Sequence, residues 1–170
     1  MVLTKAELIT ALQKEVGILI HLAQKLDDAS THYRPTAKQR SSLELLRYMT
    51  NMGPQLIKAA KTGAFDRDAW MEAAKAAEAR DWNQNVAIIK KQGDEYAKLL
   101  ADMSDADLRA EMTGFDGNKI SKGKFIVDLV LAGHAAYRTQ LFCYLKSCGR
   151  DELGTMNLWQ GVDAPAPATA

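Results

Sequence analysis

Hydrophobic residues recur every three or four positions along most of the chain, which is the spacing that places side chains on one face of an α-helix. The first such stretch follows Thr4, whose hydroxyl can cap a helix while Glu7 reaches back to the cap. It predicts a helix over residues 5–28 with an apolar stripe formed by Leu8, Leu12, Leu19, Leu22 and Leu26.

Three further long helices are predicted from the same periodicity. The second begins near residue 41 at a Ser-x-x-Glu capping box and runs to about residue 62, although Gly53-Pro54 is expected to kink it or to end its first half. The third runs from about residue 81 to residue 103, and the fourth from Ser121 to Gly149.

Shorter segments fill the connections between these helices. Residues 66–79 are Ala-rich and predict a short helix, Ser104 begins a turn or two more, and residues 113–118 predict a turn. No stretch shows the period-two alternation of a β-strand. The sequence therefore predicts an all-α fold, a four-helix bundle with short additional helices in the connections.

Composition and charge narrow the possible partners. The formal charge of +1, from 22 basic and 21 acidic residues, gives no bulk attraction to nucleic acid or to an anionic membrane. No stretch is apolar for the ~18 residues that a membrane span requires, and residues 1–11 do not resemble a secretory leader, so we expect a cytoplasmic protein. We predict one domain over residues 1–163 and a disordered Ala/Pro tail over residues 164–170.

The candidate chemistry begins with the three histidines. His21 lies about 220° round the first helix from Leu8 and should be solvated. His32 lies in the first loop, either as a surface residue or as a group overhanging a cleft. His134 shares a helical stripe with apolar residues and should face the interior, as a hydrogen-bonded core residue or as a ligand.

Glu15 is the other unusual residue, because it lies within about 40° of the leucine stripe of the first helix, where burying a carboxylate is costly. Either the stripe is only partly covered at this point, or Glu15 lines a polar cleft. The chain lacks the G-x-S-x-G, Walker-type, paired CxxC and HExxH motifs, so these enzyme classes are not expected.

Two segments resemble those of the DinB-like proteins. Residues 33–48, YRPTAKQRSSLELLRY, resemble the R-P-T loop that leads into the second helix of that family. Residues 134–145, HAAYRTQLFCYL, are similar to its fourth-helix signature H-x-x-x-H-R-G-Q-L followed by Y-L-R. The resemblance extends over about residues 4–160 and implies a DinB-like four-helix bundle.

The resemblance also implies a divalent metal held by three histidines, one from the second helix and two from the fourth. Aligned on Arg138 and Gln140, these three positions fall on Tyr48, Gly133 and Tyr137. A neutral tyrosine binds zinc or nickel poorly, so we expect no metal and no cofactor. Tyr48 and Tyr137, with nearby His134, are instead predicted to form a polar patch between the second and fourth helices.

Three functional hypotheses remain from the sequence. The preferred one is a metal-free DinB-like domain that binds a small molecule or a partner protein in the old cleft, with Tyr48, Tyr137, His134, Glu15 and His32 as candidate binding residues. The alternative is a thiol-dependent S-transferase or isomerase of the family's type. The third is a structural bundle whose surface, including the loop around His32, engages another protein.

A homodimer is also expected. The apolar stripe of the first helix is about 200° wide, from Ile18 round to Ile20, which is more than one bundle seam uses.

Overall fold

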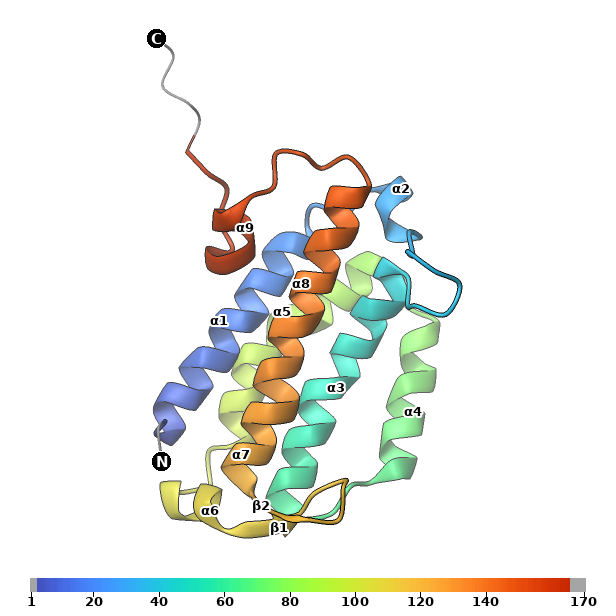
Figure 1. Cartoon of the computed structure of the whole chain (residues 1–170). Coiled ribbons are helices and arrows are strands. Elements are labelled where there is room, and N and C mark those ends of the chain that lie inside the picture. The colour runs from blue at the N-terminus through green and yellow to red at the C-terminus, as the bar shows by residue number, and fades with distance from the viewer. Residues whose placement is uncertain (1–2, 166–170) are drawn as a thin grey trace.

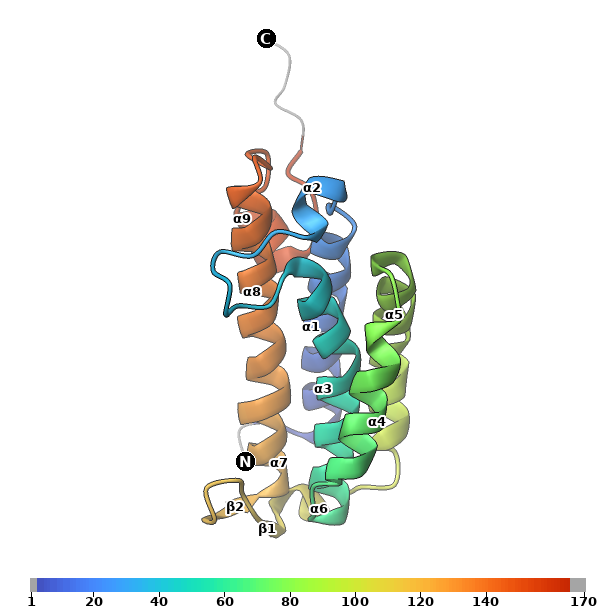
Figure 2. The same ribbon diagram turned by 90° about the vertical axis from the view of Figure 1, so that its right-hand side faces the viewer.

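The computed structural model describes residues 3–165 and shows a bundle of long helices that run side by side (Figures 1 and 2). They are α1 (Lys5–Ala23), α3 (Ser42–Thr62), α5 (Trp82–Leu99) and α8 (Ala132–Ser147). Helix α7 (Lys122–Ile126) and the π-helical segment η1 (Val127–Leu131) lead directly into α8 and lengthen it. The predicted all-α bundle is therefore confirmed.

Shorter elements occupy the connections: α2 (Asp28–Thr31), α4 (Arg67–Glu78), α6 (Asp105–Arg109) and α9 (Thr155–Gln160). Helix α4 lies along the outer side of α3 (Figure 2). Strands β1 (Glu111–Thr113) and β2 (Lys119–Ser121) form an antiparallel hairpin at one end of the bundle, where only a turn was predicted. Strands of three residues are too short for alternation to reveal them.

Side-chain caps begin the long helices where the sequence predicts them. The backbone N–H of Thr4 donates to Glu7 Oε2 at 2.8 Å, and the backbone N–H of Ser41 donates to Glu44 Oε2 at the same distance. Helix α1 ends at Ala23, earlier than the predicted residue 28, because Asp27 caps the separate short helix α2. These caps satisfy backbone donors that have no partner inside the helix.

Helix α3 continues through Gly53-Pro54, so the predicted end of its first half does not occur. Gly53 serves another purpose, because the hydroxyl of Tyr96 on α5 approaches the α3 backbone there. A Cβ atom at position 53 would lie 1.8 Å from Tyr96 Oη, a separation that no side chain could accept. The glycine therefore allows α3 and α5 to pack closely.

The C-terminal segment covers α1 from within the same chain. Helix α9 packs on α1, and a Cβ atom at Gly161 would lie 3.1 Å from the Cα of Ile18, which is buried. Much of the wide apolar stripe of α1 is thus covered by α5, α8 and α9. Because these elements cover the stripe, its width is no longer an argument for a homodimer. The homodimer stays a prediction, and light scattering that gave a monomer mass across micromolar concentrations would contradict it.

Two expectations concern the ends and the hydropathy of the chain. Residues 164–165 have no regular structure, and the rest of the predicted Ala/Pro tail lies outside the described residues. Within residues 3–165, no helix has both the length and the apolar character that a bilayer crossing demands.

Candidate functional site

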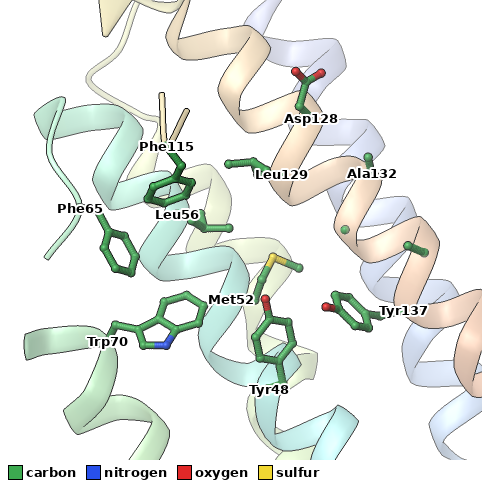
Figure 3. A pocket seen from close by; sticks show the side chains of 12 residues that line it. Tyr48, Met52, Leu56, Phe65, Trp70, Phe115, Asp128, Leu129, Ala132 and Tyr137 are labelled. Atoms are coloured by element: carbon green, nitrogen blue, oxygen red, sulfur yellow. The ribbon is translucent and has the colours of Figure 1, made fainter. Parts of the chain in front are cut away.

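A cavity of about 560 Å³ lies between α3, the start of α4, the hairpin loop, and the η1–α8 segment (Figure 3). This volume lies within the range of small-molecule sites, about 300–1,000 Å³. The cavity is lined by Tyr48, Met52, Leu56, Phe65, Trp70, Phe115, Asp128, Leu129, Ala132, Gly133, Ala136 and Tyr137.

Five aromatic rings form a continuous row around the cavity, with Tyr137 on α8 and the other four on α3, α4 and the connections (Figure 3). Each ring contacts the next, with centroid separations of 5.0 Å for Tyr137–Tyr48, 5.9 Å for Tyr48–Trp70, 5.5 Å for Trp70–Phe65 and 5.3 Å for Phe65–Phe115. Neighbouring rings are tilted by 53–82°, so no ring is covered by a parallel neighbour. Such tilted pairs are favourable and hold one another in place.

Small residues on α8 form the opposite side. Ala132 and Ala136 lie one turn apart, with Gly133 next to Ala132, and all three border the cavity, so little side-chain volume enters it. A Cβ atom at Gly133 would lie 3.0 Å from Met52 Cε, so glycine leaves room for the methionine at the base of the site. The cavity exists because large rings face small side chains.

The predicted pair Tyr48 and Tyr137 lies in this cavity, with the two hydroxyls facing each other (Figure 3). Burial, together with the neighbouring Tyr137 hydroxyl, raises the pKa of Tyr48 to about 12. Tyr48 is therefore a neutral phenol at physiological pH, able to donate or accept a hydrogen bond but not to act as a resting phenolate. The Arg40 guanidinium lies 4.1 Å from the Tyr48 ring centroid.

His134 does not join the two tyrosines, and that part of the predicted patch is wrong. It lies one position beyond Gly133 on α8, about 100° further round the helix, and so points away from the cavity. His134 Nε2 is 2.7 Å from the Tyr96 hydroxyl, and the imidazole is completely buried. Burial lowers the pKa of His134 to about 4, so it is a neutral core residue.

Glu15 also lies away from the cavity and is paired, an arrangement that neither interpretation of its position included. Its carboxylate accepts hydrogen bonds from Nε and, at 3.3 Å, from an Nη atom of Arg138, which is buried. The Arg138 guanidinium lies 5.2 Å from the ring centroid of Trp159, beside α9. Glu15 can lie on an apolar stripe because Arg138 neutralises it there.

The remaining histidines lie outside the cavity as well. His32 is an exposed residue at the end of α2, which agrees with its interpretation as a surface group. His21 is not solvated as predicted, because its side chain is 14% exposed and Asn157 lies 3.0 Å from its Nε2. Burial lowers the pKa of His21, although nearby Asp163 opposes this shift. The covering residues come from the C-terminal segment, which helix periodicity alone cannot place.

The three positions at which the family resemblance places metal ligands, Tyr48, Gly133 and Tyr137, all line this one cavity. Two phenols and a glycine do not fit a zinc or nickel ion, which takes imidazole, thiolate or carboxylate ligands. Among residues 3–165, no three His, Cys, Asp or Glu side chains lie together in a way that could hold a metal. The donor set at this position therefore does not match the implied metal.

Several cavity residues were missed from the sequence. None of Trp70, Phe65, Phe115 and Asp128 was singled out as a site residue. Phe65 and Phe115 lie in connections, and no local pattern shows that they meet. The one available signal was the run of small residues on the predicted fourth helix, at positions 132, 133 and 136.

The sequence matches no protein-family model and no curated protein. It is similar in structure to a DinB-like protein, YjoA, from Bacillus subtilis, with a TM-score of 0.67 and 16% identity, covering 90% of this chain and 96% of that one. An uncharacterised protein from Escherichia coli UTI89 gives a TM-score of 0.61 and 18% identity, covering 86% and 95%. The fold is therefore DinB-like, as the resemblance implied.

Proposed function

We propose that this DinB-like domain binds a small organic molecule in the cavity between α3 and α8, without the metal that the family resemblance implies. The observation that carries the proposal is the row of five contacting rings that borders a cavity of about 560 Å³, with the small residues Ala132, Gly133 and Ala136 leaving the space open on α8. Large apolar contact surface with a few convergent polar groups is the usual composition of a ligand site.

The walls define how such a molecule would be held. Burial of apolar ligand surface against the rings provides most of the affinity, at about 25 cal/mol per Å² removed from water. Tyr48 and Tyr137 add two hydroxyls at the cavity surface, each able to contribute about 0.5–1.5 kcal/mol through a hydrogen bond. Both phenols belong to packed, tilted ring pairs, so little side-chain freedom is lost on binding.

A metal-dependent transfer reaction is the less favoured alternative, because the ligand positions carry the wrong donors. A thiol-dependent transferase of the family's type would need the histidine triad, and this chain has Tyr48, Gly133 and Tyr137 there. Neutral phenols are poor ligands for zinc or nickel, and the raised pKa of Tyr48 disfavours the phenolate. Elemental analysis of the purified protein separates the two functions, since stoichiometric zinc or nickel would support the transferase.

A cavity-filling variant tests the binding proposal. Ala136 is an exposed residue that lines the cavity, so Ala136→Phe places a ring in the cavity. Ala87→Phe makes the same change at an exposed residue of α5, away from the cavity. The probe is the neutral dye N-phenyl-1-naphthylamine, whose fluorescence rises in apolar sites. We expect Ala136→Phe to weaken dye binding by about tenfold or more and Ala87→Phe to leave it within about twofold. Equal binding by both variants would contradict the proposal.

A further inference from the structure

The charges around the cavity are unequal in sign. Among its lining residues, Asp128 carries a negative charge and none is Lys, Arg or His. The neighbouring cavity of about 600 Å³ between α3 and α4 shares Tyr48 and Trp70 but includes Arg40 and Arg47. The basic groups thus lie on the other side of the Tyr48–Trp70 pair. An anionic ligand would meet no cationic side chain in the cavity between α3 and α8.

The aromatic row gives the cavity a second electrostatic preference. The face of an aromatic ring carries the negative end of its quadrupole, so a cation near several ring faces is attracted to each of them. The rings of Tyr137, Tyr48, Trp70, Phe65 and Phe115 are tilted relative to their neighbours, and none is stacked on another. One face of Tyr48 is covered by the Arg40 guanidinium, 4.1 Å from the ring centroid, so a ligand meets this ring on the side of the cavity. Trp70, which gives the strongest interaction of this kind, lies in the middle of the row.

Among the described residues, Asp128 is the one charged residue that lines the cavity; it lies at the rim, with its carboxylate directed away from the rings in Figure 3. Its side chain is 41% exposed and is paired with Lys124 one turn earlier, whose side chain is 63% exposed. Exposed ion pairs of this kind are weak, so a bound cation could take the place of Lys124 as the partner of Asp128. The π-helical turn η1 is the element that carries Asp128 and Leu129 to the cavity.

From these features we infer that the ligand is an organic cation of the alkylammonium or quaternary ammonium class, held by the aromatic row with Asp128 as its counter-charge. The inference rests on the proposed function and specifies its ligand class. A cation of this class is attracted by the rings and by the carboxylate, and no basic side chain among the described lining residues repels it. A neutral ligand uses the apolar walls and the two hydroxyls but not the carboxylate, and an anion is opposed by Asp128.

A pair of isosteric probes tests the charge directly. Choline and 3,3-dimethyl-1-butanol have nearly the same shape, but the first has a quaternary nitrogen where the second has a neutral carbon. Titration calorimetry with the full chain should show choline binding about tenfold or more tightly than the alcohol. Equal or tighter binding of the alcohol would overturn the inference and leave the proposed function standing, because the cavity would still bind a small molecule.

Two substitutions locate the effect. Trp70→Leu keeps apolar bulk but removes the ring, and should abolish the preference for choline while the neutral dye still binds. Asp128→Asn is an exposed change that should weaken choline about threefold or more and leave the alcohol unchanged, with Asp94→Asn on α5 as the matched control. If Trp70→Leu does not fold, the Asp128→Asn result alone decides.

The remaining outcomes are also distinct. Binding of the dye without binding of choline would overturn the cation class and keep the proposed function. Failure of the dye as well, with no effect of Ala136→Phe, would remove the proposed function and the inference with it.

Discussion

Two stripes of α8, formed by Gly133 with Tyr137 and by His134 with Arg138, have different surroundings, although they are offset by only one residue in the sequence. Gly133 and Tyr137 border the aromatic cavity between α3 and α8. His134 and Arg138 are buried and have polar partners on other elements, Tyr96 for the histidine and Glu15 for the arginine. A rotation of about 100° around the helix therefore separates residues that border open space from residues that connect α8 to the bundle.

This difference distinguishes residues that support the fold from residues that could bind a ligand. A buried charge or imidazole has to be paired, and losing its partner affects the whole fold. A phenol at the edge of a cavity can lose its hydroxyl with little effect on the fold. Substitutions in the two stripes should thus separate stability from binding, and four predictions test this.

The largest effect is expected at Arg138, because it neutralises the carboxylate of Glu15 inside the bundle. Arg138→Met should lower the free energy of unfolding by about 3 kcal/mol, since it leaves a largely buried carboxylate without a partner. Urea denaturation measures the loss. The double variant Glu15→Leu/Arg138→Met should recover most of it, whereas a loss of under about 1 kcal/mol in the single variant would mean that the pair is not buried in solution.

The second effect is a dependence of stability on pH that arises from His134. Its pKa is lowered to about 4 in the folded chain, against about 6.5 when unfolded, so the unfolded chain binds more protons between these values. The stabilisation is complete above about pH 6.5 and is lost as the pH falls toward 4, by about 3 kcal/mol in all. His21, whose pKa is also lowered, changes stability in the same direction.

His134→Gln should remove most of this slope in urea denaturation between pH 6.5 and 4.5, while His21→Gln should remove less of it. The window stops at pH 4.5 because carboxylates with lowered pKa, such as those of Glu7 and Asp27, begin to contribute below it. An unchanged slope in His134→Gln would place the imidazole in contact with water.

The third prediction concerns how closely α3 and α5 pack beside His134. Gly53→Ala should destabilise the chain by about 1–3 kcal/mol, because the new methyl group would overlap the Tyr96 hydroxyl. Gly17→Ala is the matched control in α1, where a Cβ atom would meet no neighbour within 4 Å, and it should raise stability by up to about 1 kcal/mol. Similar melting temperatures for the two variants would show that α3 and α5 are further apart than described.

The smallest effect is expected from the loss of a single tyrosine hydroxyl, compared between Tyr96 in the core and Tyr137 in the cavity. Tyr96→Phe leaves the His134 imidazole without its hydroxyl partner and should cost about 1–3 kcal/mol of stability. Tyr137→Phe should cost under about 0.5 kcal/mol of stability and should change binding of a hydrogen-bonding cavity ligand by about 0.5–1.5 kcal/mol. If Tyr137→Phe changes only stability, the phenol pair is packing and not part of a binding site.

Local signals in the sequence predicted the helices but only part of the candidate site. Thr4 and Ser41 mark helix starts through contacts within four residues, so their capping boxes could be recognised directly. The closeness of Tyr48 and Tyr137 followed from aligning the helix motifs. His134 was correctly predicted to face the interior, where it is hydrogen-bonded to Tyr96, but its grouping with the two tyrosines was wrong, because it lies about 100° round the helix from Gly133.

The rest of the site depends on contacts between segments that are distant in sequence. Phe65 and Phe115 meet at 5.3 Å although 50 positions separate them, and both lie in connections without periodicity. The pairing of Glu15 with Arg138 likewise requires knowing which face of α8 meets α1. Patterns along the chain contain no information of this kind, so these contacts had to come from the structure.

The π-helical turn η1 sets the rotational phase between two halves of one long helix. On one side, α7 is held against α6, where a Cβ atom at Gly123 would lie 3.0 Å from the carbonyl oxygen of Leu108. On the other side, α8 is fixed by Arg138. A π turn contains one residue more than an α turn, and it can take up a mismatch between the two fixed ends. Deleting one residue within Val127–Leu131 would turn η1 into an ordinary α turn and leave α8 in nearly the same phase relative to α7, so Gly133 and Tyr137 would still border the cavity.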